Sequence, residues 1–195
     1  RFDVRNNVVY NAGGPNVAGD TFEANYVGNY HKPGPDSPAG HPVFSPTEKA
    51  ALRFHFAENE PADLRWSVRP GITEVDQPFE SPQVRTTSAE RAYEEVLAHA
   101  GATLPLRDAV DERIVREVRE GTGAHIDSQW EAGGWPAIES GRPPRDTDRD
   151  GMPDDWELKR GLKPRDAADA ALIAPSGYTW IEEYLNELAA RGALR

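Results

Sequence analysis

Acidic side chains recur at close intervals in one short stretch near the end of the chain, Asp146-Thr-Asp-Arg-Asp-Gly-Met-Pro-Asp-Asp-Trp-Glu157. A twelve-residue EF-hand loop places oxygen ligands at positions 1, 3, 5, 7, 9 and 12, with a glycine at position 6. Gly151 supplies that glycine. The ligands that the spacing predicts are Asp146, Asp148, Asp150, the backbone carbonyl of Met152, Asp154 and Glu157.

Calcium accounts for this concentration of negative charge. Without a cation, the five carboxylates of the pattern would repel one another and oppose folding. Magnesium is less suited, because it requires a tight octahedron and gives up its waters reluctantly. The alternative without a metal is a solvated acidic turn.

A second stretch of the same length, residues 172–183, lacks the acidic ligands. Gly177 and Glu183 fill positions 6 and 12, but positions 1, 3 and 5 hold Leu172, Ala174 and Ser176. We therefore expect one Ca²⁺ with a structural role. A dockerin-like interaction module would need two competent loops, so that interpretation ranks last.

The composition narrows the remaining function classes. The chain has 195 residues and a net charge of −11, which disfavours binding to nucleic acid or to anionic membrane surfaces. It has no cysteine, so disulfides and cysteine nucleophiles are excluded. The five histidines show no metal-ligand spacing, and no G-x-S-x-G motif is present. No apolar run reaches the roughly 18 residues that a membrane-spanning helix needs.

Short strand-like segments with asparagines recur in the first third of the chain. Asn7 and Asn29 occupy equivalent places in two such segments, and a third copy covers residues 52–59. This recurrence predicts the coils of a parallel β-helix, whose stacked asparagines hydrogen-bond along a ladder. The alternative is a pair of hairpins with asparagine in the turns.

The rest of the chain alternates between proline-rich loops and helices. Residues 31–50 and 61–86 are expected to be surface loops. A capping box at Thr87 and Glu90 predicts a helix that ends at Gly101. Asp108 should cap a second helix, with Val110, Ile114 and Val118 on its apolar face.

The expected domain organisation follows from these elements. Residues 1–86 form the coils and loops, residues 87–140 form a helical segment packed on them, and residues 141–195 hold the calcium loop and a helix pair. A short helix follows the loop, and the last helix begins at a capping box formed by Thr179 and Glu182. Trp180 and Tyr184 should pack against the short helix.

Several segments together, in this order, resemble one known family. They are residues 4–11, 25–35, 92–102, 105–115, 133–136 and the loop and helix that end at residues 184–186. The chain resembles the C-terminal half of bacterial secreted pectate lyases, the parallel β-helix enzymes of polysaccharide lyase family 1. The resemblance spans nearly the whole chain and is weakest over residues 36–86.

The resemblance implies a fold and an activity. The fold is mainly β: the last coils of a right-handed parallel β-helix, followed by a loop-rich, helical C-terminal region with the EF-hand-like calcium loop. The activity is β-elimination on polygalacturonate, in which Ca²⁺ bridges uronate carboxylates and an arginine removes the proton at C5. The resemblance also implies a protein that is secreted or periplasmic.

The family's catalytic arginine and catalytic calcium ligands do not map onto this sequence. Arg1 and Arg5 are the nearest basic residues, and neither matches that position. We therefore expect no catalytic residue here, and expect the segment to need the N-terminal part of the same protein. The expected contacts with the acidic plant polysaccharide are Tyr30 and Lys32. The alternative is a non-catalytic β-helix that binds polysaccharide.

Overall fold

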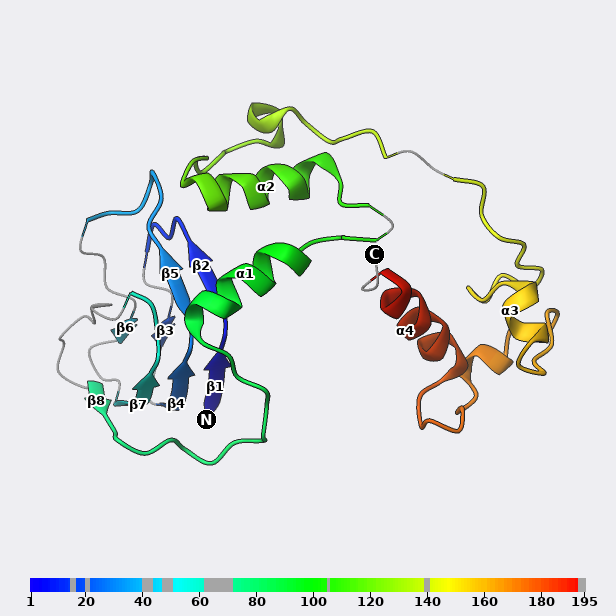
Figure 1. The fold of residues 1–195 in the computed structure, drawn as a ribbon, viewed down its shortest axis with the longest axis horizontal. Helices are drawn as coiled ribbons and strands as arrows, with labels where there is room; N and C mark the ends of the chain where they lie inside the picture. Colours follow the sequence, from blue (N-terminus) through cyan, green and yellow to red (C-terminus); the bar gives the residue numbers. More distant parts are fainter. Residues whose placement is uncertain are drawn as a thin grey trace. The chain divides into compact units, whose positions relative to one another are not determined.

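The computed structural model describes residues 1–14, 17–19, 22–39, 44–46, 51–61, 72–104, 106–138 and 141–192 (Figure 1). The chain divides into two compact units. Unit 1 comprises Arg1–Ala102 and Asp108–Pro136, and unit 2 comprises Thr103–Arg107 and Ala137–Arg195. None of the described helices is both long and apolar enough to cross a membrane.

The strands of unit 1 pair only in parallel within the described part of the chain. Sheet order is β1-β4-β7-β8 in the largest sheet, with β2-β5 and β3-β6 as two smaller sheets (Figure 1). The strands are β1 (Phe2–Arg5), β2 (Val8–Tyr10), β3 (Val17–Gly19), β4 (Phe22–Val27), β5 (Tyr30–Lys32), β6 (Phe44–Pro46), β7 (Leu52–Ala57) and β8 (Ile72–Glu74). The parallel pairing confirms the predicted strand direction, and the hairpin alternative is wrong.

The main core of unit 1 is formed by one face of its largest sheet. Alternating residues of β4 and β7 point inward, as the period of two in a strand requires. Ala24, Tyr26, Leu52 and Phe54 are almost completely buried. Tyr26 also stacks flat on Phe56, with ring centroids 5.7 Å apart, so successive turns are joined through aromatic contact.

The predicted asparagine ladder is present. The Nδ2 of Asn7 donates to Oδ1 of Asn29 at 2.9 Å, and the Nδ2 of Asn29 donates to Oδ1 of Asn59 at 3.0 Å. The backbone N–H groups of Asn7 and Asn29 donate to the same two oxygens. Asn29 and Asn59 are buried, so each rung satisfies polar groups that water cannot reach.

Helix α1 (Ala89–His99) begins one residue later than predicted. Its N-cap is Ser88, whose hydroxyl accepts a hydrogen bond from the N–H of Arg91. Thr87 does not cap the helix: its hydroxyl donates to the carbonyl of Ser88, and its backbone N–H and carbonyl bond to the side chain of Asn6. The last helical residue is His99, Ala100 is the C-cap, and Gly101 follows with a φ of 80°, at the place where the sequence predicts the stop.

Helix α2 (Ala109–Glu120) has the predicted Asp108 N-cap and a left-handed Gly121 at its end. Its buried face differs from the prediction: Val115 and Val118 are buried, whereas Ile114 is exposed. They pack with Leu97 of α1, and Tyr10 of β2 packs against this cluster. A short 3-10 helix, η1 (Gln129–Ala132), follows.

The two proline-rich stretches contain more structure than expected. Strand β6 lies within residues 31–50 and β8 within residues 61–86, because each pairs with a strand of an earlier turn. The segment after β8 crosses the outer face of the largest sheet, where Asn25 exchanges hydrogen bonds with the backbone of Phe79. The predictions for residues 40–43, 47–50 and 62–71 lie outside the described residues.

Unit 2 has a small core of its own. Its elements are α3 (Asp154–Leu158), the 3-10 helix η2 (Asp169–Ala171) and α4 (Trp180–Gly192). Before α4, the side chain of Glu182 accepts from the backbone N–H of Thr179, as in the predicted capping box. Trp156 meets Trp180 and Tyr184 edge-on, with ring centroids 6.3 and 5.2 Å apart, as the sequence predicts.

Candidate metal centre

The acidic loop is folded by its own carboxylates. The two oxygens of Asp146 accept hydrogen bonds from the N–H groups of Arg149 and Gly151, at 2.6 and 3.0 Å. Oδ1 of Asp150 accepts from the N–H of Met152 at 2.8 Å. Arg149 and Gly151 both have positive φ, 64° and 98°. The loop therefore curls tightly and turns its carboxylates inward.

Two groups of carboxylates result, and they share one residue. Oxygens of Asp146, Asp148 and Asp150 lie within 4.8 Å of one another. Oxygens of Asp150, Glu157 and Asp169 also lie within 4.8 Å of one another. Asp150 belongs to both groups, so the loop, the first helix after it and the later turn at η2 converge on one place.

These carboxylates are buried and have few partners in the part of the chain that the structure describes. Glu157 has 0% of its surface exposed, and neither of its oxygens has a hydrogen-bond partner. Both oxygens of Asp148, Oδ2 of Asp150 and Oδ1 of Asp169 are likewise buried without a partner. An unpaired carboxylate is costly to bury, so the cluster requires either protons or a cation.

The burial and crowding of these carboxylates raise the pKa of two of them. Burial, followed by the charges of Asp150 and Asp148, raises the pKa of Glu157 to about 7. Burial also raises the pKa of Asp150, and the negative charges of Asp148 and Asp146 add to the effect. A divalent cation would reverse both shifts, because it favours the charged carboxylates.

The donor set fits a hard cation. It consists of carboxylates and carbonyl groups, which Ca²⁺ binds six to eight at a time in flexible geometry. The side chain of Met152 is completely buried in the core of unit 2, so only its backbone could serve the ion.

Asp154 differs from the other predicted ligands. Its oxygens accept hydrogen bonds from the N–H and the hydroxyl of Thr147, both at 2.7 Å, and it forms an ion pair with Arg145 at 3.1 Å. The Thr147 bonds, together with Arg145, lower its pKa. Asp154 belongs to neither carboxylate group.

Asp169 joins the carboxylates although the sequence pattern does not predict it. It lies outside the twelve-residue pattern, in the segment Lys163-Pro-Arg-Asp-Ala-Ala-Asp169, and no spacing rule connects it to the loop. Asp169 reaches the other carboxylates only because of the path that the chain takes after α3, and the sequence pattern does not predict that path.

The two predicted substrate contacts have structural partners. The ring of Tyr30 lies 4.5 Å from that of Tyr93, centroid to centroid. The Nζ of Lys32 donates to the carbonyls of Val118 and Arg119, in the last turn of α2, at 2.6 and 2.8 Å. Both side chains thus hold helices against the sheets, and their contact with sugar stays a prediction.

Arg1 and Arg5 are both held in ion pairs. Arg1 pairs with Glu23 at 2.8 Å, and Arg5 pairs with Asp3 at 2.8 Å. Arg5 also lines a surface pocket of about 430 Å³ with Arg85. Neither arginine contacts either of the two carboxylate groups found among the described residues, and the absence of a catalytic role stays a prediction.

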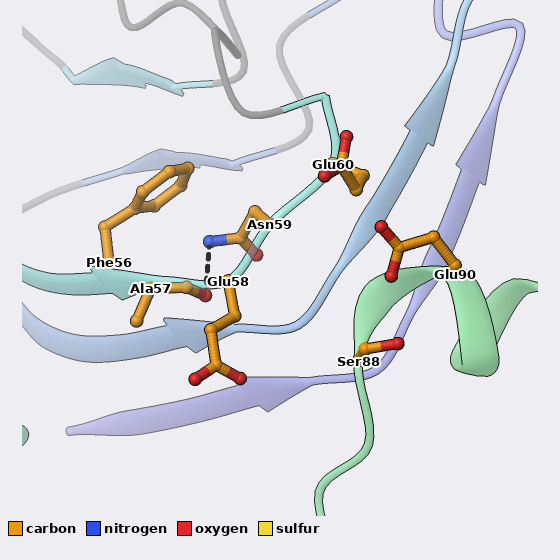
Figure 2. A pocket seen from close by; sticks show the side chains of 7 residues that line it. All are labelled: Phe56, Ala57, Glu58, Asn59, Glu60, Ser88 and Glu90. Carbon is orange, nitrogen blue, oxygen red and sulfur yellow. Dashed lines mark hydrogen bonds between the residues drawn. The ribbon is translucent and has the colours of Figure 1, made fainter.

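A second pocket of about 430 Å³ lies at the end of β7, beside the start of α1 (Figure 2). Its walls carry the carboxylates of Glu58, Glu60 and Glu90, together with Asn59 and Ser88 (Figure 2). Among the described residues, two groups of acids are close enough to share an ion, and these three glutamates belong to neither. Their negative charge also makes the pocket a poor site for an anionic polysaccharide.

Comparison with known proteins gives a further observation on this chain. The chain is 31% identical over 206 residues to probable pectate lyase C of Emericella nidulans, a match that covers 96% of this chain and 47% of the relative. The chain is pectate-lyase-like in sequence. Probable pectate lyase C of Aspergillus terreus is 33% identical over 95% of this chain and 48% of its own length.

The match covers only part of each relative. The pectate-lyase-like chain spans about half the length of the curated relatives it matches. Those relatives are fungal, whereas the sequence resemblance was drawn to bacterial enzymes. No family model and no solved structure matches the chain.

Proposed function

We propose that this chain is the C-terminal segment of a polysaccharide lyase that cleaves polygalacturonate by β-elimination. The observation that carries the proposal is the similarity to probable pectate lyase C proteins over 94–96% of the chain. The activity belongs to the complete protein. This segment supplies no catalytic residue and is inactive alone.

The architecture supports the proposal. Unit 1 repeats one pattern, in which the strands of each turn pair in parallel with those of the next, and an asparagine from each turn bonds to the next. We interpret these turns as the last coils of a right-handed parallel β-helix. A groove along such coils suits a linear polymer, because each turn repeats the same surface at a fixed spacing.

We further propose that unit 2 holds one Ca²⁺ at the acidic loop. The proposed loop ligands are Asp146, Asp148, Asp150, the carbonyl of Met152 and Glu157. The buried, unpaired oxygens of Glu157 and Asp148 support this role. Asp154 contributes to the loop by bonding Thr147. The ion is structural and separate from any ion that takes part in the reaction.

The partners follow from the function. The substrate is an acidic plant polysaccharide, so the protein acts outside the cell or in the periplasm. The other partner is the preceding part of the same protein, which would carry the basic and acidic residues of the reaction. Nucleic acid and membrane surfaces are not partners, in line with the net charge of −11.

The test is an activity assay on the complete protein. Polygalacturonate is supplied with and without a chelator, and the double bond that β-elimination creates is followed by its ultraviolet absorbance. We expect absorbance to rise with the complete protein and calcium, and to stay flat with this segment alone. A complete protein that acts on no uronate polymer would overturn the lyase function and favour a non-catalytic polysaccharide-binding β-helix.

A further inference from the structure

Asp169 has one carboxylate oxygen engaged and one free within the described residues. Oδ2 accepts a hydrogen bond from the N–H of Lys163 at 2.8 Å, whereas Oδ1 is buried without a partner. The backbone is also fixed: its N–H donates to the carbonyl of Asp166, and its own carbonyl accepts from Leu172, both at 3.0 Å. The free oxygen therefore has a defined direction.

That direction leads to the acidic loop. The free oxygen belongs to a group with Asp150 and Glu157, whose oxygens lie within 4.8 Å of one another. Glu157 is completely buried, and both of its oxygens lack partners. None of the ion pairs found among the described residues involves these three carboxylates. The negative charges face one another with no positive side chain between them.

We infer that Asp169 is a ligand of the Ca²⁺ proposed for the acidic loop, so that one ion joins the loop to the turn at residues 163–171. The inference rests on the calcium site of the proposed function and adds to it a ligand from outside the loop. A further carboxylate strengthens Ca²⁺ binding, because affinity rises with the number of charged ligands and the rigidity of the site.

The core of unit 2 is built from the same segments as this ligand set. Its central cluster is Met152, Trp156 and Ala170, each one or two residues from Asp150, Glu157 or Asp169. The partly buried residues packed against this cluster are Leu162, Trp180, Ile181 and Tyr184. So small a core does not stabilise a unit of this size without further help. Ion and core therefore form together, and folding of unit 2 is coupled to calcium binding.

The experiment is a calcium titration of the full chain. Binding is followed by calorimetry and by tryptophan fluorescence, because Trp156 and Trp180 lie in the core of unit 2. We expect Asp169→Ala to weaken Ca²⁺ affinity by about tenfold or more. The matched control is Asp166→Ala in the same turn, whose carboxylate pairs with Lys163 at the surface and should leave affinity unchanged.

A second variant separates ligation from local folding. Asp169→Asn keeps an oxygen for the Lys163 N–H but loses the charge, so its affinity should fall between those of the native chain and Asp169→Ala. Native affinity in both Asp169 variants would overturn the inference and leave the loop site intact. A native chain that binds no calcium would overturn the calcium site of the proposed function as well.

Discussion

Asn7, Asn29 and Asn59 bond directly to one another across three turns of the chain. Their role was predictable, because each asparagine follows a similar strand-like segment, and such recurrence indicates a structural repeat even where the spacing varies. Asp169 was not predictable on the same terms. Asp169 lies close to Glu157 because of the path that the chain takes between α3 and η2. The spacing of acidic residues in the sequence does not predict that path.

A buried pair, Tyr26 and His31, makes unit 1 sensitive to acid. The Tyr26 hydroxyl and Nε2 of His31 lie 2.6 Å apart inside the molecule. Burial lowers the pKa of His31 from 6.5 to about 4 and raises the pKa of Tyr26. The imidazole is therefore neutral in the folded protein over a range where it is charged in the unfolded chain.

We predict that unit 1 loses stability as the pH falls from 6.5 to 4. The unfolded chain binds the proton in that range and the folded chain does not, so unfolding is favoured by up to about 3 kcal/mol. Denaturant unfolding at several pH values measures this slope. His31→Gln should flatten it, whereas His99→Gln, at an exposed position, should leave it unchanged. An equal slope in all three proteins would contradict the prediction.

At the scale of elements, the ends of α2 were easier to predict than its buried face. Asp108 and Gly121 bound α2 as expected, because capping depends on local backbone chemistry. The buried face of α2 depends instead on what lies beneath it. Tyr10 and Leu97 contact Val115 and Val118, and leave Ile114 exposed. The pattern of α2 alone cannot specify those neighbours.

Lys32 gives a second prediction at this scale. Its ammonium group binds the last carbonyls of α2, where a positive charge also complements the helix dipole. Lys32→Met should therefore destabilise unit 1 by about 1–2 kcal/mol in chemical denaturation. Arg91→Met is the control, because it removes only a surface ion pair with Glu95 and should cost less than about 1 kcal/mol.

The same variant tests the expected sugar contact. If Lys32 binds substrate, Lys32→Met should lower the affinity of the protein for an oligogalacturonate and leave its stability unchanged. If Lys32 has only a structural role, Lys32→Met should lower the stability and leave that affinity unchanged in protein that is still folded. The observed contacts with Val118 and Arg119 favour the second result.

At the scale of the whole molecule, each unit has a separate core. Unit 1 is held by the apolar residues of its largest sheet and by the contacts of α1 and α2, whereas unit 2 has Met152, Trp156 and Ala170 beside the acidic cluster. The proposed ion belongs to unit 2 alone. Stability of the two units should therefore respond differently to its removal.

We predict that a chelator lowers the melting temperature of unit 2 and leaves that of unit 1 unchanged. Saturating calcium stabilises the state that binds it, and its loss should lower the melting temperature by roughly 15 °C or more for a unit of this size. Differential scanning calorimetry with and without chelator measures both transitions.

Substitution should reproduce the effect of the chelator. Asp148→Ala combined with Asp150→Ala removes two proposed ligands and should make unit 2 insensitive to calcium. Asp155→Ala, at an exposed position of the same stretch, should respond to calcium as the native chain does. If neither chelation nor the double variant changes the melting of unit 2, the loop is only an acidic turn.

The ladder of asparagines also indicates how a chain of this kind can lengthen by duplication and insertion. Its first two rungs are 22 residues apart and the next two are 30 apart, yet the strands on both sides keep an unbroken parallel register. The additional residues fall between β5 and β7 in the sequence, and neither ladder asparagine of that turn is among them. Tandem duplication of one complete turn would thus add a rung without shifting the others, and insertions between strands would vary the surface while the stack stays the same.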